Sequence, residues 1–150
     1  MRIHEVMSDP VFVVTPDTPA EDAWQLMRTR GVRHLVVKED SNVVGILSDS
    51  DAGGPSGAAV RAGAIVADLM DRRFVTIGRD DTVRNAANLM RGRGIGCLPV
   101  IHRGKLAGVV TIADMLAVIG GGVDRPGHEK RAAMHHRVPH RRALAATGKW

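Results

Sequence analysis

The sequence has no tyrosine, and its two tryptophans and two phenylalanines make aromatic residues only 3% of 150. A core must therefore consist of Val, Ile, Leu, Met and Ala, which a hydrophobic content of 44% allows. Cys97 is the only cysteine, so an intramolecular disulfide is excluded. We expect a cytoplasmic protein, because the N-terminus lacks an apolar signal core and no run approaches the roughly 18 apolar residues of a membrane span.

Motifs of catalysis are also missing. The chain has no Gly-x-Ser-x-Gly elbow, no Walker A loop and no Cys-x-x-Cys pair. Cys97 lies in an apolar run with no evident histidine partner, which favours a small core residue over a nucleophile. We therefore expect a protein that is not an enzyme and that has no catalytic residues.

Charge of one sign is concentrated at the C-terminal end. Residues 1–122 hold 14 basic and 14 acidic side chains, whereas residues 123–150 hold seven basic and two acidic ones, which gives the whole net charge of +5. The basic character therefore belongs to this tail, residues 123–150, for which we expect a flexible polar segment. Without a motif or interleaved aromatics, the tail predicts at most weak contact with nucleic acid and none with a membrane.

The tail also carries four histidines. His136 and His140 have the i,i+4 spacing that can hold zinc on a helix. Pro139 lies between them and basic residues surround them, so we expect no metal site.

An internal repeat organises the rest of the chain. Without gaps, residues 7–51 align with residues 70–114 at an offset of 63, and 12 of these 45 positions are identical. The identical positions include Met7/Met70, Ala23/Ala86, Gly31/Gly94, Gly45/Gly108 and Asp51/Asp114.

Each copy has the pattern of a β-α-β-β-α unit after a short helical lead-in at 3–7 or 65–70. Thr18, Pro19 and Glu21 predict a capping box for the first helix, and Asp81 takes the cap position of the second. Gly31 and Gly94 predict the helix ends. The predicted strands are 11–14, 35–37 and 43–47 in the first copy, and 74–77, 98–101 and 105–110 in the second.

A closing helix is predicted to begin at Ser48 in the first copy and at Thr111 in the second. The first should be short, because Gly53, Gly54, Pro55 and Gly57 break helices. We thus predict an α/β (α+β) fold of two repeats, residues 1–60 and 61–122, related by a pseudo-two-fold axis and followed by the tail 123–150.

The ends of the two hairpins carry the same chemistry. Gly-h-h-[Ser/Thr]-x-x-Asp, where h is apolar, occurs with Ser48 and Asp51 and again with Thr111 and Asp114. These residues could simply cap helices. A carboxylate fixed at a strand end can also accept hydrogen bonds from both hydroxyls of a ribose, while a nearby hydroxyl and backbone amides donate hydrogen bonds to a phosphate.

With these motifs, residues 3–119 resemble a tandem pair of cystathionine β-synthase (CBS) domains, or Bateman module. The resemblance rests on both Gly-h-h-[Ser/Thr]-x-x-Asp motifs and on the lead-ins and repeats that surround them: Met7-Ser8-Asp9-Pro10, Met70-Asp71, Met27-x-x-x-Gly31-Val32-x-x-Leu35-x-Val37 and Met90-x-x-x-Gly94-Ile95-x-x-Leu98-Pro99-Val100. Such pairs are regulatory modules that bind adenosine-containing ligands in clefts between their repeats. The resemblance also implies a homodimer.

The resemblance assigns roles to particular residues. Asp51 and Asp114 match ribose-binding acids, and Ser48 and Thr111 match hydroxyls near the ribose and phosphate. The remaining matches are Thr18 and Asp81 before the first helix of each copy, Val32 and Ile95 beside the base, and the small residues Ala23 and Ala86. For Val32, Ile95 and the two alanines, core packing is an equally good interpretation.

The two copies differ in the charge available for a phosphate. Arg33 and His34 follow Gly31-Val32, whereas Gly96 and Cys97 stand in the second copy. Arg33 and His34 can supply positive charge to a phosphate, although a surface Arg and a partly buried His would look the same in sequence. Asp81 in place of Thr18 disfavours a polyphosphate. We therefore expect two unequal sites.

The function that we predict is a non-enzymatic sensor of an adenine nucleotide or related adenosyl ligand (ATP, ADP, AMP or S-adenosylmethionine). It requires no cofactor and passes its state to an effector protein that the sequence does not identify. Two alternatives remain: a nucleic-acid-associated protein that uses the tail, and a stress-response dimer with empty clefts.

Overall fold

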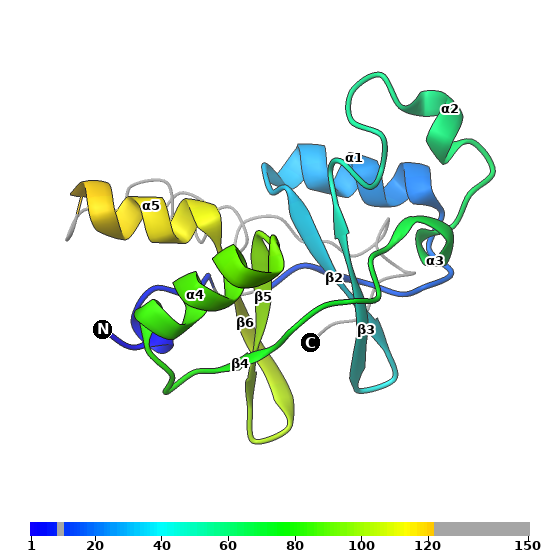
Figure 1. Ribbon diagram of the computed structural model, residues 1–150. Coiled ribbons are helices and arrows are strands. Elements are labelled where there is room, and N and C mark those ends of the chain that lie inside the picture. Colours follow the sequence, from blue (N-terminus) through cyan, green and yellow to red (C-terminus); the bar gives the residue numbers. More distant parts are fainter. Residues whose placement is uncertain (9–10, 122–150) are drawn as a thin grey trace. The chain divides into compact units, whose positions relative to one another are not determined.

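The computed structural model describes residues 1–8 and 11–121, which form two compact units (Figure 1). The β1–β3 unit comprises residues 12–73. The β4–β6 unit comprises residues 1–8, 11 and 74–121. Asp9, Pro10 and the tail with its histidines lie outside the described residues.

The β1–β3 unit is a three-stranded sheet with helices. Strand β1 (Val13–Val14) runs parallel to β2 (His34–Glu39), which pairs antiparallel with β3 (Asn42–Ser48). Helix α1 (Ala20–Arg30) connects β1 and β2, and the short helices α2 (Ala58–Arg61) and α3 (Val66–Leu69) follow β3. Its core includes Trp24, Met27, Leu35 and Leu47. Apolar residues at helical spacing in α1 thus meet those of the sheet.

The β4–β6 unit repeats this order. Strand β4 (Ile77–Gly78) runs parallel to β5 (Cys97–His102), which pairs antiparallel with β6 (Lys105–Thr111). Helix α4 (Val83–Arg93) precedes the hairpin, α5 (Ile112–Gly121) follows it, and the lead-in η1 (Ile3–Glu5) is a 3-10 helix. The predicted mixed α/β class with two β-α-β-β-α repeats is confirmed, although the hydrogen-bonded parts of β1 and β4 are shorter than predicted.

Both predicted helix ends are confirmed. Gly31 after α1 and Gly94 after α4 adopt φ values of 69° and 65°, the left-handed conformation that glycine accepts without steric cost. The amide of each donates to a carbonyl of the last helical turn.

The lead-in segments pair with the last strand of each hairpin. The amide of Ser8 donates to the carbonyl of Val109 (2.8 Å), and that of Val109 donates back to Ser8 (3.2 Å). Asp71 and Ile46 make the equivalent two bonds, at 2.8 and 3.0 Å. Asp71 and Ile46 are the repeat counterparts of Ser8 and Val109, at the offset of 63 residues. The lead-in of the first repeat therefore belongs to the unit that contains the strands of the second repeat, and the lead-in of the second repeat belongs to the unit that contains the strands of the first.

Gly45 and Gly108 allow this close approach of two backbones. A Cβ at Gly108 would lie 2.7 Å from the carbonyl oxygen of Ser8 and 2.9 Å from Sδ of Met7. A Cβ at Gly45 would meet Sδ of Met70 at 2.7 Å and the Asp71 carbonyl oxygen at 3.1 Å. The identical Gly and Met positions of the repeat therefore have one steric cause.

The predicted N-caps were wrong by one residue in both helices. The N-cap of α1 is Pro19, and the first amide of the helix, that of Ala20, donates to the carbonyl of Ala64 instead of to Thr18. Since that carbonyl satisfies the amide, a capping side chain is not needed. In α4 the cap is Thr82, whose hydroxyl accepts from the amide of Asn85.

The prediction of a closing helix that begins at Ser48 is wrong. Residues 49–57 form turns, and the next helix is α2, from Ala58. Gly53 and Gly54 have φ of 91° and 69°, and a Cβ at Gly57 would lie 2.5 Å from the backbone of Gly53. These glycines close a tight turn in place of the helix that forms as α5 in the other unit. Across residues 1–8 and 11–121, no helix combines the length and apolar character needed to cross a membrane.

We predict that Gly108→Ala destabilises the protein by about 1–3 kcal/mol, because a backbone oxygen blocks the new methyl group. Gly45→Ala should cost less, since its nearest obstacle is the flexible end of Met70. Urea unfolding followed by circular dichroism measures both. The control is Gly92→Ala inside α4, where no atom lies within 4 Å and alanine should stabilise by about 0.5–1 kcal/mol. Equal losses at Gly45 and Gly108 would contradict this steric account.

Candidate functional site

Asp51 lies just after the end of β3, in a turn closed by its own motif. The Ser48 amide donates to Oδ2 of Asp51 (3.1 Å), and the Asp51 amide donates to Oγ of Ser48 (3.0 Å). These reciprocal bonds hold the carboxylate at the strand end without a helix. Asp51 is half-buried. Its other oxygen, Oδ1, has no bond to any described residue.

Asp114 has the same motif but a different environment. Its Oδ2 accepts from the amide (2.9 Å) and hydroxyl (3.1 Å) of Thr111, and its amide lies 3.3 Å from Oγ1 of Thr111. Oδ1 accepts from the hydroxyl of Ser8 (3.3 Å). Asp114 is only 2% exposed, in the first turn of α5. Both carboxylate oxygens are therefore engaged, one of them by the lead-in segment.

Arg33 and His34 lie at the same end of the β2–β3 hairpin as Ser48 and Asp51. His34 is the register partner of Ser48 across the two strands. The Arg33 side chain is 81% exposed, and its Nε donates to Oδ2 of Asp49 (3.1 Å). The structure thus brings together the predicted residues Arg33, His34, Ser48 and Asp51, and it adds Asp49, which had not been predicted.

His34 is held in its neutral form. Burial lowers the pKa of His34, and the nearby Arg33 acts in the same direction, whereas Asp49 and Asp51 oppose them. Since the lowered pKa lies below the ordinary value of about 6.5, His34 brings little positive charge to this site at pH 7. Arg33 is the cation of the site.

At the corresponding end of the β5–β6 hairpin, Gly96 and Cys97 stand at the repeat positions of Arg33 and His34. Cys97 is the register partner of Thr111, and Ile112 stands at the repeat position of Asp49. Burial, followed by the charge of Asp114, raises the pKa of Cys97 to about 12. The thiol therefore stays protonated and is a poor nucleophile.

The remaining predicted residues lie closer to the cores. Val32 and Ile95 are partly buried and pack against the clusters of their own units, which agrees with core packing. Thr18 is 2% exposed, and its Oγ1 accepts from the amide of Thr15 (3.2 Å). Asp81 accepts from the amide nitrogen of the Asn85 side chain (3.0 Å) and the amide of Gly78 (3.4 Å). Thr18 and Asp81 thus stabilise the turns before α1 and α4.

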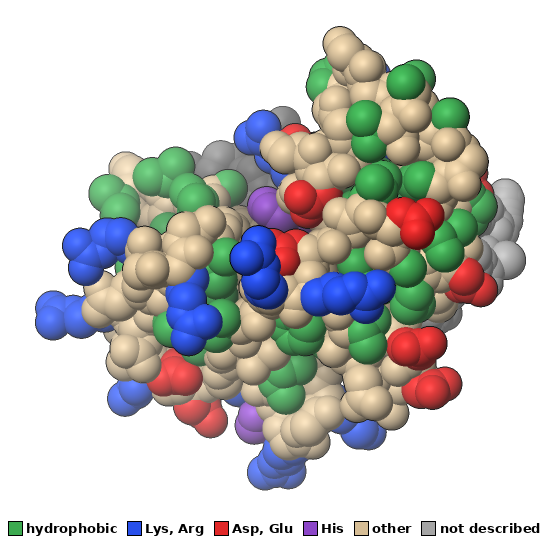
Figure 2. Space-filling view, turned by 45° about the vertical axis from the view of Figure 1, so that its right-hand side comes forward, with side chains coloured by type: hydrophobic (Ala, Val, Ile, Leu, Met, Phe, Trp, Pro, Cys, Tyr) green, Lys and Arg blue, Asp and Glu red, His purple; other side chains and the backbone are tan. Residues whose placement is uncertain are grey.

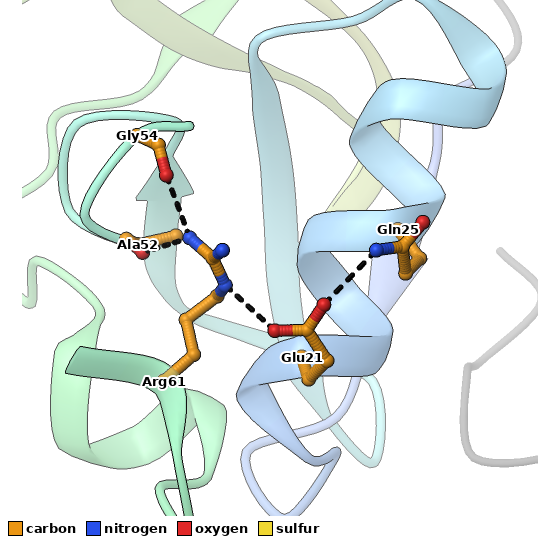
Figure 3. A network of polar contacts seen from close by, with 5 residues as sticks. All are labelled: Glu21, Gln25, Ala52, Gly54 and Arg61. Atoms are coloured by element: carbon orange, nitrogen blue, oxygen red, sulfur yellow. Dashed lines mark hydrogen bonds and ion pairs between the residues drawn. The ribbon is translucent and has the colours of Figure 1, made fainter. Parts of the chain in front are cut away.

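One residue near the site was missed by sequence reasoning. Arg61 is almost fully buried, with 3% of its side chain exposed. Its Nη1 donates to the carbonyls of Ala52 and Gly54, and its Nε donates to Oε1 of Glu21, each at 2.8 Å (Figure 3). Its guanidinium lies 4.4 Å from the ring centroid of Trp24. A single charge in the apolar run from Ala58 to Ala67 was the available signal.

Arg61 links helix α1 to the turn that contains Asp49 and Asp51. Two carbonyls of the turn converge on one guanidinium, which leaves the turn little freedom to move (Figure 3). Glu21 is held in turn by Gln25, whose Nε2 donates to Oε2 (2.9 Å). Arg61 therefore stabilises the turn that stands in place of the predicted closing helix, mainly through its bonds to these two carbonyls.

The described surface shows no metal centre. Within residues 1–8 and 11–121, no three His, Cys, Asp or Glu side chains gather as metal ligands. Figure 2 shows both basic and acidic side chains on the face that it displays.

Comparison with known proteins identifies relatives of both repeats. The family model described as CBS domain matches residues 3–52 and 66–121. An inosine-5'-monophosphate dehydrogenase from Thermoplasma acidophilum is 31% identical over 116 residues, which cover 77% of this chain and 23% of that enzyme. The chain thus spans less than a quarter of the length of that relative.

Solved structures share the fold. A CBS domain pair in complex with 5'-methylthioadenosine and S-adenosyl-L-methionine superposes with a TM-score of 0.73 at 21% identity, covering 81% of this chain and 97% of that one. A CBS-domain containing protein from Agrobacterium tumefaciens gives a TM-score of 0.68 at 24% identity and covers 79% and 99%.

We predict that Arg61→Met costs about 2–4 kcal/mol in urea unfolding, because the buried carbonyl of Ala52 and the partly buried carbonyl of Gly54 lose this donor. Glu21→Gln, the control, should cost less, because Glu21 is half-exposed and its pair with Arg61 is screened by water. A loss at Glu21 as large as that at Arg61 would show that the ion pair, and not the fastening of the turn, is the main contribution.

The lowered pKa of His34 predicts a pH effect on stability. The unfolded chain binds a proton at His34 more readily than the folded chain, so the folded state loses stability as pH falls through about 6.5. Thermal unfolding from pH 7.5 to 5.5 should show a smaller decline for His34→Gln than for wild type. Parallel profiles would contradict the assigned cause.

Proposed function

Because this chain belongs to the CBS domain family, with two copies in tandem, we propose that it is a non-enzymatic regulatory module that binds an adenosine-containing ligand. The observation that carries the proposal is the cluster at the end of the β2–β3 hairpin, where Asp51, Ser48 and Arg33 lie together. The ligand is an adenine nucleotide (AMP, ADP or ATP) or a related adenosyl compound.

Asp51 is the ribose acceptor in this proposal. The Ser48 amide uses Oδ2, so Oδ1 is the oxygen that would accept a ribose hydroxyl. A charge-assisted hydrogen bond of this kind is short and strong, and two vicinal hydroxyls match the two oxygens of a carboxylate. The backbone turn at Ser48 keeps the acid in place before the ligand arrives.

Arg33 is the phosphate-binding residue in this proposal. Its contact with Asp49 uses Nε alone, so both terminal nitrogens stay available for a phosphate group. The pair is exposed and contributes little to stability, so a phosphate can compete with Asp49 at small cost. Because Gly96 and Cys97 replace Arg33 and His34 in the second repeat, the first repeat offers the better phosphate site.

A relative widens the ligand class. The CBS domain pair solved with 5'-methylthioadenosine and S-adenosyl-L-methionine binds adenosyl ligands that carry no phosphate. The ribose acid is common to both ligand classes, and only Arg33 discriminates between them. We therefore propose adenosyl binding through Asp51 for either class, and phosphate binding through Arg33 for nucleotides.

The proposed output is a change in association with another protein. Binding that favours one conformation or one dimer shifts the population of the module, and an effector protein reads that state. We propose a homodimer. Two alternatives are a nucleic-acid-associated protein that uses the tail and a stress-response dimer without a ligand; salt-dependent DNA binding that is lost on truncation at Gly122 would favour the first.

Thermal shift with ATP, ADP, AMP, S-adenosylmethionine, NAD and cyclic dinucleotides tests the proposal. A ligand at 100 times its Kd should stabilise the protein by about 2.7 kcal/mol. We expect Asp51→Asn to abolish the shift for every ligand that binds. Wild-type curves that do not move with any compound would favour the dimer without a ligand.

Calorimetry of Arg33→Ala separates the two ligand classes. We expect affinity for nucleotides to fall about tenfold, the effect of one charge-assisted hydrogen bond of about 1.4 kcal/mol. Affinity for 5'-methylthioadenosine should not change, because it has no phosphate. Arg84→Ala, which removes an exposed arginine of α4, is the control. Unchanged nucleotide affinity in Arg33→Ala would remove Arg33 from the site.

A further inference from the structure

The carboxylates of the two strand-end motifs differ in burial and in hydrogen bonding. Asp51 is half-buried and has one oxygen, Oδ1, without a bond to the described residues. Asp114 is 2% exposed, and Thr111 and Ser8 occupy its two oxygens. The motifs share the glycine, the hydroxyl and the acid, whereas the donor to Oδ1 of Asp114 is a residue outside the motif, Ser8.

The lead-in segments differ in what they offer the two acids. Ser8 pairs with Val109 on β6, and its hydroxyl donates to Oδ1 of Asp114 (3.3 Å). Asp71 holds the equivalent place beside Ile46 on β3, with the same pair of backbone bonds. The backbone therefore brings residue 8 and residue 71 to corresponding positions, and their side chains decide what each strand-end acid meets.

A hydroxyl and a carboxylate act in opposite ways at this position. The Ser8 hydroxyl donates a hydrogen bond to a carboxylate. An ionised Asp71 has no proton to donate, and its negative charge repels another carboxylate. Asp71 instead accepts from the amide of Arg73 (2.8 Å), and its Oδ1 lies 3.6 Å from Nε of Arg73. Asp51 consequently receives no donor from its lead-in.

This difference matters to a ribose. At Asp114, a ribose hydroxyl that approaches Oδ1 competes with the bond from Ser8, so its net gain is smaller than at an oxygen without that donor. It must also reach a carboxylate that is almost fully buried under a paired segment. At Asp51 a ribose hydroxyl adds a bond to Oδ1 and replaces only water.

We propose that residues 8 and 71 are specificity-determining positions that select Asp51 over Asp114. The chain then binds one adenosyl ligand per chain, and Ser8 keeps the second acid closed. This inference rests on the proposed function, because it takes the strand-end acids as the ribose acceptors. It adds the stoichiometry and the residues that set it.

Isothermal titration of the full chain with 5'-methylthioadenosine and with AMP tests the inference. We expect one equivalent per chain in the wild type, at least a tenfold loss of affinity in Asp51→Asn and no loss in Asp114→Asn. Ser8→Ala should add a second equivalent, because it removes the hydroxyl that donates to Oδ1 of Asp114. Circular dichroism confirms that each variant folds.

Two variants at position 71 test whether a donor from the lead-in weakens binding at Asp51, and neither variant changes the buried Asp114. Asp71→Ser places a hydroxyl beside Asp51 and should weaken binding severalfold, whereas Asp71→Ala removes the same carboxylate and should leave affinity unchanged. A destabilised fold would weaken binding in both variants, so only the donor explains a difference between them.

The outcomes separate this inference from the proposed function. Two equal equivalents in the wild type, or loss of binding in Asp114→Asn but not in Asp51→Asn, would overturn the selection of Asp51 and leave adenosyl binding intact. Equal affinities of Asp71→Ser and Asp71→Ala would overturn the role of residue 71. An absence of binding by the wild type would overturn the proposed function and this inference together.

Discussion

The backbone pairing between each lead-in and the last strand of a hairpin is the constraint on which the rest of the structure depends. At Ser8–Val109 and Asp71–Ile46 the two backbones exchange hydrogen bonds. Gly45 and Gly108 lack the methyl group that would keep these segments apart. Because each glycine lies three residues before the hydroxyl of the strand-end motif, the same contact that closes the unit sets the surroundings of its acid.

The two strand-end motifs show how neighbours change the chemistry of identical residues. Arg33, His34 and Asp49 surround Asp51, whereas Gly96, Cys97 and Ile112 stand at the same repeat positions near Asp114. Of these two sets, only the first contains an arginine. The turn after Ser48 replaces a helix, and the buried Arg61 compensates by joining that turn to α1.

Much of the fold could be predicted because its signals are local or repeated. Gly31 and Gly94 mark helix ends, and apolar periodicity places the hairpins. The caps of α1 and α4 were displaced by one residue. In α1 the carbonyl of Ala64, 44 residues away in sequence, accepts from the first helical amide, and in α4 the hydroxyl of Thr82 accepts from the amide of Asn85. The helix expected at Ser48 did not form, because glycines close the segment as a tight turn and Arg61 stabilises it.

The sequence by itself determined the repeat, most of the order of strands and helices, and the family, because these follow from residue types and their spacing along the chain. The assignment of Arg33, Ser48 and Asp51 to a site stays a prediction. Only the tertiary structure decided which lead-in meets which hairpin, that Asp49 pairs with Arg33 and that Ser8 bonds to Asp114. Residues 8 and 114 are 106 positions apart, and a pattern read along the chain carries no information on such a contact. Their meeting depends on backbone pairing that forms when the unit folds.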